Sequence, residues 1–209
     1  MQGQINLNTN LGIAIYNLIK DYDIKNILEI GTWNGYGSTM CIIRSLIDNV
    51  KNCNFISVEA NHSQFMLASS NLKNYQEYVK LLYGRITSLK DLVSLEDYDS
   101  SFFLQYSKAI QEQWYQVDVE QHHNSPYIYD EIISMTNNNI DLLILDGGEY
   151  CTYGEFSKLK NISNFIILDD TNTIKNYKAA EEIRSCKNIF KIIEDNQYDR
   201  NGYMICQRV

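Results

Sequence analysis

Short apolar runs alternate along the chain with segments in which apolar residues recur every three or four positions. The periodic segments predict helices at residues 10–21 and 38–48, and further helices after the second and fourth apolar runs. The runs themselves predict buried strands at residues 26–31, 54–60, 78–84, 141–147 and 164–170. This alternation predicts an α/β fold of Rossmann-like, doubly wound architecture, in which helices cover both faces of a mostly parallel sheet.

Polar residues mark several of the predicted helix ends. Ser38 is a candidate N-cap for the helix at 38–48. Asn61 with Gln64, and Thr152 with Glu155, have the spacing of capping boxes. They predict two more helices, which extend to about residues 72 and 159.

The pattern changes at the end of the chain. Residues 189–209 contain two strand-like runs on either side of Asn201 and Gly202, a strong turn signal. The resulting hairpin places an antiparallel strand beside the parallel ones. We therefore expect one domain, residues 1–209, with a seven-stranded, mostly parallel sheet.

Residues 87–139 are too long for a simple crossover between the third and fourth strands. Phe102, Phe103, Tyr106, Ile110 and Trp114 in this segment have the spacing of one helix face, and 127–135 is a helix-like run. Such a face is typical of ordinary packing. The alternative is that residues at about 97–138 form an inserted segment that acts as a lid over the ligand-binding end of the sheet.

Composition excludes some partners. The formal net charge is −8 and no basic stripe is visible, so nucleic acids and anionic membranes are not expected as main partners. Five scattered cysteines without C-x-x-C spacing, and a polar N-terminus, indicate free thiols in the cytoplasm. A small-molecule substrate is expected as the partner, and the sequence leaves the oligomeric state, including a homo-oligomer, open.

Ligands of open α/β sheets bind beyond the carboxyl ends of the strands. The first strand is followed by "GTWNGYGS", in which Gly31, Gly35 and Gly37 permit a tight turn. This turn matches neither G-x-G-x-x-G nor a P-loop. Glu59 ends the second strand, where a carboxylate can accept hydrogen bonds from both hydroxyls of a ribose. Together they predict an adenosine-type ligand.

"ILEIGTWNGYGS" followed by "ISVEA" resembles the first two motifs of class I S-adenosylmethionine-dependent methyltransferases, and in particular the catechol O-methyltransferase type. "LDGGEY" is similar to the D-G-x-H turn of sugar and natural-product O-methyltransferases. The resemblance implies S-adenosylmethionine as cofactor. It also implies that the cofactor is bound by Glu29, Gly31, Thr32, Trp33, Gly35, Glu59, Ala60, Arg85, Ile86, Asp146 and Gly147, with Ile86 as an apolar wall for adenine.

The resemblance further implies a divalent cation. Asp146, Asp169 and Asp170 match positions at which catechol-type enzymes hold Mg²⁺. The last of these positions is Asn in those enzymes, whereas this chain has Asp170. Three adjacent carboxylates would also repel one another without a cation, which favours a hard ion with oxygen ligands. The alternative is that Asp169 or Asp170 caps a helix or binds loop amides.

Glu149 stands where the relatives carry a lysine or histidine base. It is therefore a candidate general base, or a further ligand for metal or substrate, or only an exposed acid. Asp146 is a second candidate catalytic residue, and His122 and His123 are alternative bases. We expect transfer of a methyl group to a hydroxyl of a small polar metabolite, such as a sugar or natural product, with assistance from a metal. The alternatives are N-methylation, a non-catalytic cofactor-binding protein and a nicotinamide-dependent oxidoreductase.

Overall fold

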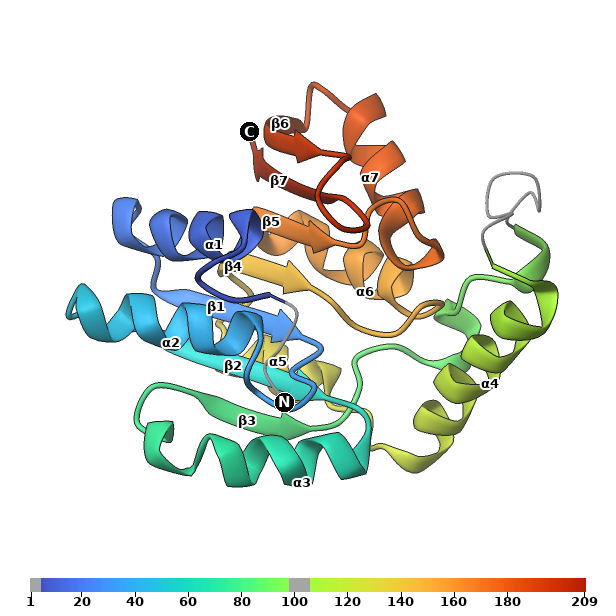
Figure 1. The fold of residues 1–209 in the computed structure, drawn as a ribbon, viewed down its shortest axis with the longest axis horizontal. Helices are drawn as coiled ribbons and strands as arrows, with labels where there is room; N and C mark the ends of the chain where they lie inside the picture. The colour runs from blue at the N-terminus through green and yellow to red at the C-terminus, as the bar shows by residue number, and fades with distance from the viewer. Residues whose placement is uncertain (1–4, 98–105) are drawn as a thin grey trace.

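The computed structural model describes residues 5–97 and 106–209, and within these residues it has one mixed sheet (Figure 1). The strands run in the order β3-β2-β1-β4-β5-β7-β6. They are β1 (Asn26–Ile30), β2 (Asn54–Glu59), β3 (Lys80–Tyr83), β4 (Ile140–Leu145), β5 (Ser163–Asp169), β6 (Phe190–Asn196) and β7 (Tyr203–Arg208). β1 to β5 are parallel, and β7 pairs antiparallel with both β5 and β6. The predicted fold class is confirmed, hairpin included.

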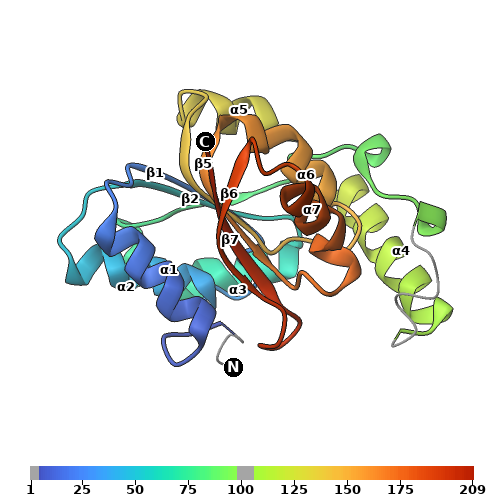
Figure 2. The same ribbon diagram turned by 90° about the horizontal axis from the view of Figure 1, so that it is seen from above.

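Helices cover both faces of this sheet, as Figure 2 shows. They are α1 (Asn10–Asp21), α2 (Ser38–Asp48), α3 (His62–Asn71), α4 (Lys108–Asn124), α5 (Tyr129–Met135), α6 (Thr152–Leu159) and α7 (Ile174–Ser185). α1, α2 and α3 pack on one face, and α5, α6 and α7 pack on the other. Within the described part of the chain, no helix is both long and apolar enough to cross a bilayer.

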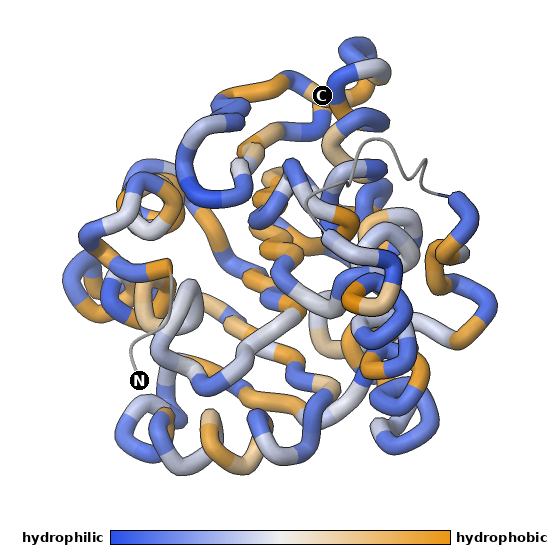
Figure 3. The backbone as a smooth tube through the Cα atoms, turned by 45° about the vertical axis from the view of Figure 1, so that its right-hand side comes forward, coloured by the Kyte–Doolittle hydropathy of each residue, from blue (hydrophilic) through white to orange (hydrophobic). Residues whose placement is uncertain are grey.

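Side chains alternate between these two faces along each central strand. In β4, Leu142 belongs to the core under α1 and α2, whereas its neighbour Leu143 belongs to the core under α5, α6 and α7. Both are fully buried. The helices differ from these strands: along each helix, hydrophilic and hydrophobic residues alternate (Figure 3). Burial on both faces explains why the parallel strands are almost continuously aliphatic in sequence.

The long segment between β3 and β4 contributes two different helices. α5 is the ordinary crossover helix, since Ile132 packs into the core beside α6 and α7. α4 lies apart, beyond the carboxyl ends of the parallel strands (Figures 1 and 2). Its Trp114 packs against Tyr106, with ring centroids 4.8 Å apart, in a small cluster that includes Tyr150. Phe102 and Phe103 lie outside the described residues.

Two of the predicted caps are wrong. Gly37, not Ser38, is the N-cap of α2, because the Ser38 hydroxyl donates to a buried glutamate instead. Cys151 precedes α6 without a side-chain cap, and the Thr152 hydroxyl inside the helix donates to the Gly148 carbonyl. The third prediction is half right.

In that third cap, the Asn61 side chain accepts from the Gln64 amide at 3.1 Å. The Gln64 side-chain oxygen, however, is buried without a hydrogen-bond partner. The reciprocal bond of a capping box is therefore not made, and this oxygen is left facing the site described next.

Candidate functional site

A cavity of about 550 Å³ opens where the carboxyl ends of β1, β2, β4 and β5 meet. This volume is in the range that holds small ligands and cofactors. Most of the site residues predicted from the sequence line it, namely Gly31, Thr32, Trp33, Glu59, Ala60, Arg85, His122, Asp146, Gly147, Glu149, Asp169 and Asp170.

The turn after β1 is packed tightly against the turn after β4. Gly31 has φ 97°, and a Cβ at this position would lie 2.0 Å from the Asp146 carbonyl oxygen. Only glycine fits both the conformation and the space. Trp33 follows at φ 51°, an unfavourable conformation for a bulky residue. The turn is therefore held in shape by its surroundings.

Glu29 lies beneath this turn and is fully buried. Its carboxylate accepts hydrogen bonds from the hydroxyls of Ser38 at 2.6 Å, Thr39 at 2.7 Å and Ser57 at 2.5 Å. Burial raises the pKa of Glu29 to about 7, and the hydroxyls oppose that shift. Glu29 thus joins β1, β2 and α2 from below and does not line the cavity.

Glu59 at the end of β2 faces the cavity. Its Oε2 accepts from the Trp33 amide at 2.6 Å and its Oε1 accepts from the Asn61 amide at 2.8 Å. Burial raises the pKa of Glu59 to about 7. Each carboxylate oxygen can accept a further hydrogen bond. The unpartnered Gln64 oxygen lies in the wall of the same cavity.

The three aspartates that follow β4 and β5 come together, with oxygens within 4.8 Å of one another. Sequence reasoning missed the cations beside them. Lys175 Nζ donates to Asp146 Oδ1 at 2.7 Å and to Asp170 Oδ2 at 2.9 Å. Arg200 donates to Asp169 Oδ2 at 3.2 Å.

These contacts set the charge of the cluster. Burial opposes the charge on Lys175, but the aspartates hold the pKa of its ammonium well above the usual range. Burial alone would raise the pKa of Asp170, yet the charge of Lys175 keeps it below its ordinary value. The space in which a divalent ion would sit between Asp146 and Asp170 is bridged by an ammonium group. This arrangement does not fit the predicted Mg²⁺.

Glu149 reaches the cavity from the turn after β4. Its Oε2 is buried without a hydrogen-bond partner. Burial raises the pKa of Glu149 to about 7, an effect that nearby aspartates reinforce and Lys175 opposes. A carboxylate with this pKa can take up a proton at neutral pH. Glu155 in α6 also lines the cavity with an unpartnered Oε2, and burial raises its pKa to about 8.

Asp118, a buried residue of α4, holds this turn in place. Asp118 Oδ2 accepts from the Tyr150 amide at 2.7 Å. A Cβ on Gly148 would lie 2.2 Å from Asp118 Oδ1, so the turn passes directly over the carboxylate. His122 is one helical turn further along α4, and its Nδ1 donates to the Asp118 carbonyl at 2.7 Å.

Neither histidine is positioned as a base. The Nδ1 bond of His122 leaves Nε2 of the neutral ring as an acceptor, which the Thr87 hydroxyl engages at 2.9 Å. Burial also lowers the pKa of His122. His123 is exposed and lies outside the cavity wall.

Two predicted cofactor contacts also lie elsewhere. Ile86 is fully buried in the core beside α5, so it offers no wall to a ligand. Gly35 has φ 81° and packs against Leu72 of the α3 side. Arg85 does line the cavity, but its guanidinium donates to the His122 and Thr87 carbonyls at 2.9 and 2.6 Å.

Solved structures share this architecture. An O-methyltransferase from Bacillus cereus in complex with SAH is 16% identical, with a TM-score of 0.61 over 99% of this chain and 84% of that one. TomG, an O-methyltransferase from Streptomyces achromogenes involved in tomaymycin synthesis, in complex with SAM, is 14% identical, with a TM-score of 0.58 over 95% of this chain and 79% of that one. The chain has the class I methyltransferase fold. Neither a protein-family model nor a curated protein matches it.

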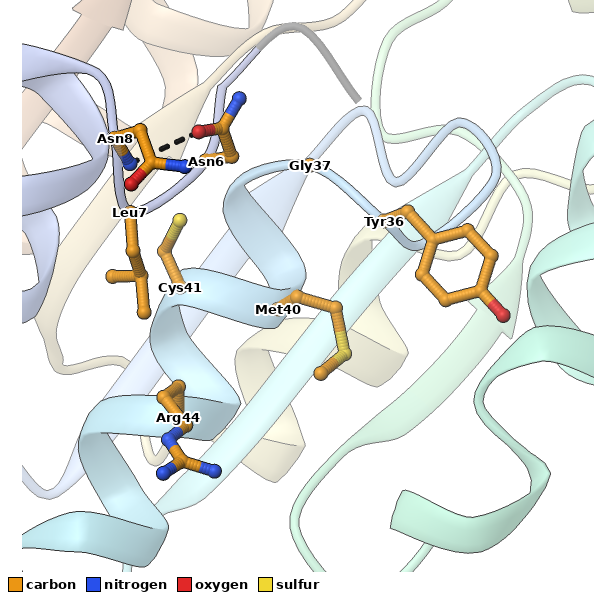
Figure 4. A pocket seen from close by; sticks show the side chains of 8 residues that line it. All are labelled: Asn6, Leu7, Asn8, Tyr36, Gly37, Met40, Cys41 and Arg44. Carbon is orange, nitrogen blue, oxygen red and sulfur yellow. Dashed lines mark hydrogen bonds between the residues drawn. The ribbon is translucent and has the colours of Figure 1, made fainter. Parts of the chain in front are cut away.

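A second cavity, of about 480 Å³, lies between residues 6–8 and the first part of α2 (Figure 4). Leu7, Met40 and Cys41 contribute to its wall, while Tyr36 and Arg44 extend from its rim. No carboxylate lines this second cavity in the part of the chain that the structure describes. The cavity at the strand ends, in contrast, is lined by Glu59, Asp146, Glu149, Glu155, Asp169 and Asp170.

Lys175 could have been found from its place in the sequence. It is the second residue of α7, where a positive charge is unfavourable against the helix dipole. Helical side chains also lean toward the N-terminus, which here points back at the end of β5. Gln64, in the first turn of α3, is aimed at the cavity for the same reason.

Proposed function

We propose that this chain is an S-adenosylmethionine-dependent methyltransferase that methylates a hydroxyl of a small polar metabolite. One observation carries the proposal above the others. Gln64, Glu149 and Glu155 each leave a buried oxygen without a partner in the wall of a single cavity at the end of a methyltransferase fold. Buried polar atoms are normally paired, so these oxygens indicate a bound ligand with several donors.

The residues present fit the cofactor. Glu59 would accept from the ribose hydroxyls, and the Gln64 oxygen can accept from an exocyclic amine such as that of adenine. Gly31 and Gly147 let the backbone pass close to the ligand, and the acidic wall suits its positive sulfonium. The bound cofactor supplies an electrophilic methyl group.

Glu149 would supply the base. A hydroxyl acceptor must lose its proton as it attacks, and a carboxylate with a pKa near 7 is able to take that proton at neutral pH. The carboxylate-rich wall suits a polyhydroxylated acceptor, such as a sugar or a natural product, because each acid can accept from a hydroxyl. No step requires a metal.

The part of the 97–138 segment that the structure describes also supports the proposal. α4 adds Gln121 and His122 to the cavity wall, which supports a role for this segment in covering the ligand. The cysteines in the structure are all free thiols, which supports a reducing compartment such as the cytoplasm.

Thermal denaturation tests the cofactor assignment. S-adenosylhomocysteine at about 100 times its Kd should stabilise the protein by about 2.7 kcal/mol, which raises Tm by roughly 5–11 °C for a domain of this size. NADH should have no effect. Glu59→Gln should reduce the shift, and Glu77→Gln, the same change at an exposed residue, should not. Stabilisation by NADH alone would contradict the proposal.

Turnover tests the reaction. Release of S-adenosylhomocysteine from S-adenosylmethionine should be followed with panels of sugars, phenols and amines. Hydroxyl acceptors are expected to be methylated. Methylation of amines alone would replace the O-methyltransferase by an N-methyltransferase, and cofactor binding without turnover on any class would indicate a non-catalytic protein.

A further inference from the structure

The cluster of Asp146, Asp169 and Asp170 already contains its counter-charge. We propose that the Lys175 ammonium is the resident cation of this cluster, that it excludes a divalent ion, and that methyl transfer by this chain is independent of metal. The first two statements concern the free protein. The third rests on the proposed function.

The contacts of the ammonium carry this inference. Its nitrogen lies 2.7 Å from Asp146 and 2.9 Å from Asp170, so it joins the strand end of β4 to that of β5. A metal ion bound in this cluster would need the same two carboxylates that the Lys175 ammonium already contacts. A divalent ion would have to expel Lys175 or sit against its positive charge, and Lys175 is buried with 9% of its surface exposed.

Two further oxygens of the cluster accept hydrogen bonds from other side chains. Arg200 donates to Asp169 at 3.2 Å, and the Asn201 side chain donates to Asp170 Oδ1 at 3.0 Å. Both residues come from the turn between β6 and β7. Each of the three aspartates therefore has a protein donor, and Lys175 and Arg200 reduce the mutual repulsion that favoured a metal in the sequence.

The position of Lys175 strengthens this reading. A lysine in the first turn of a helix opposes the helix dipole, so the site is unfavourable unless negative groups face it. Here two aspartates face it directly. Lys175 also lines the cavity, and two of its three N–H groups are used on the aspartates. The third can donate to a ligand oxygen.

In methyl transfer Lys175 would act by its charge and stay protonated. The acceptor oxygen forms a bond to the methyl carbon, the carbon–sulfur bond breaks, and its electron pair remains on sulfur. The hydroxyl proton passes to Glu149. The ammonium stabilises the negative charge that develops on the acceptor oxygen before transfer is complete.

Metal binding tests the proposal without any assay of turnover. Titration of the wild-type protein with Mn²⁺, followed by the electron paramagnetic resonance signal of free Mn²⁺, should show no loss of signal beyond that seen with Asp170→Asn. Mn²⁺ and Mg²⁺ should not raise Tm. Stoichiometric Mn²⁺ binding by the wild type that Asp170→Asn abolishes would overturn the proposal.

Removal of the ammonium should open the site. Lys175→Met keeps the length of the side chain without its charge, and it should raise Mn²⁺ affinity by more than about tenfold. Lys178→Met, on the same helix, is the matched control and should not. A folded Lys175→Met protein, shown by its near-ultraviolet circular dichroism, that gains no Mn²⁺ binding would overturn the proposal. If this variant does not fold, the wild-type titration decides.

The two proposals can fail separately. If S-adenosylhomocysteine does not bind, the proposed function fails, whatever Mn²⁺ does. If it binds, turnover should be unchanged by a chelator. Turnover that a chelator abolishes and Mg²⁺ restores would overturn the proposal while leaving the methyltransferase assignment intact.

Discussion

Glu149→Gln removes the proposed base while keeping the size and shape of the side chain. Burial raises the pKa of Glu149 to about 7, so that both the carboxylate and the acid form are present near neutral pH. General-base catalysis is worth roughly 10²- to 10⁴-fold. We therefore expect kcat to fall by that factor, with the Kd for S-adenosylhomocysteine changed by less than about threefold, because the proposed cofactor contacts are made by other residues.

The pH dependence follows from the same pKa. The base acts only when deprotonated, so kcat/KM, which follows the pKa values of the free enzyme, should increase with pH, about tenfold per unit well below pH 7, and level off above about pH 8. Stopped assays with S-adenosylmethionine across pH 5–9 would measure the profile. In Glu149→Gln this limb should disappear, and Glu149→Asp should restore part of the rate.

Glu131→Gln, the same change at an exposed residue of α5, is the control and should behave as the wild type. The reasoning is refuted if Glu149→Gln keeps more than about a third of the wild-type kcat, or if it loses rate but keeps the same pH profile. In the second case Glu149 would act by shaping the site.

Three further results are expected. Gly31→Ala should lower Tm and abolish binding of S-adenosylhomocysteine, since its Cβ would lie 2.0 Å from a carbonyl oxygen, whereas Gly37→Ala meets nothing within 4 Å and should be tolerated. Glu29→Leu should cost about 3 kcal/mol or more in urea denaturation because it leaves three hydroxyls without their acceptor; a loss below about 1 kcal/mol would contradict this. The pKa values of Glu29 and Glu155, about 7 and about 8, lie above those of the unfolded chain, so the folded state binds more protons. The free energy of unfolding should therefore fall as the pH increases from about 4.5 to 8, and it should fall less steeply in Glu29→Gln. An equal slope in the wild type and in Glu29→Gln would disprove this prediction.

The fold could be predicted because the central strands β1, β2, β4 and β5 are buried on both faces. That burial demands aliphatic runs such as the one before Asp146, and such runs are visible in the sequence. The location of the site followed from topology, since the carboxyl ends of parallel strands meet at one edge. The N-caps were less predictable. Ser38 and Thr152 have the residue type of a cap, but their hydroxyls have other acceptors that only the folded chain brings near.

The charge balance of the site could not be read from the spacing of its acids. Asp146, Asp169 and Asp170 are brought together by adjacent strands, and their sequence shows only the negative groups. Lys175 comes from the following helix and Arg200 from a hairpin turn thirty residues on. Whether a cation beside acids is a metal or a side chain is decided by such long-range contacts.

The close passage of Gly148 over Asp118 links two positions that are thirty residues apart in the chain. Any side chain at 148 would displace the carboxylate that binds the Tyr150 amide, and loss of the acid would in turn remove the reason for glycine. Over evolutionary time the two positions should therefore change together: descendants that keep the acid keep the glycine, and those that lose the acid are free to place a side chain at 148. In such a lineage a substitution of Asp118 on α4 permits a second one at 148, which alters the wall of the cavity and with it the acceptor.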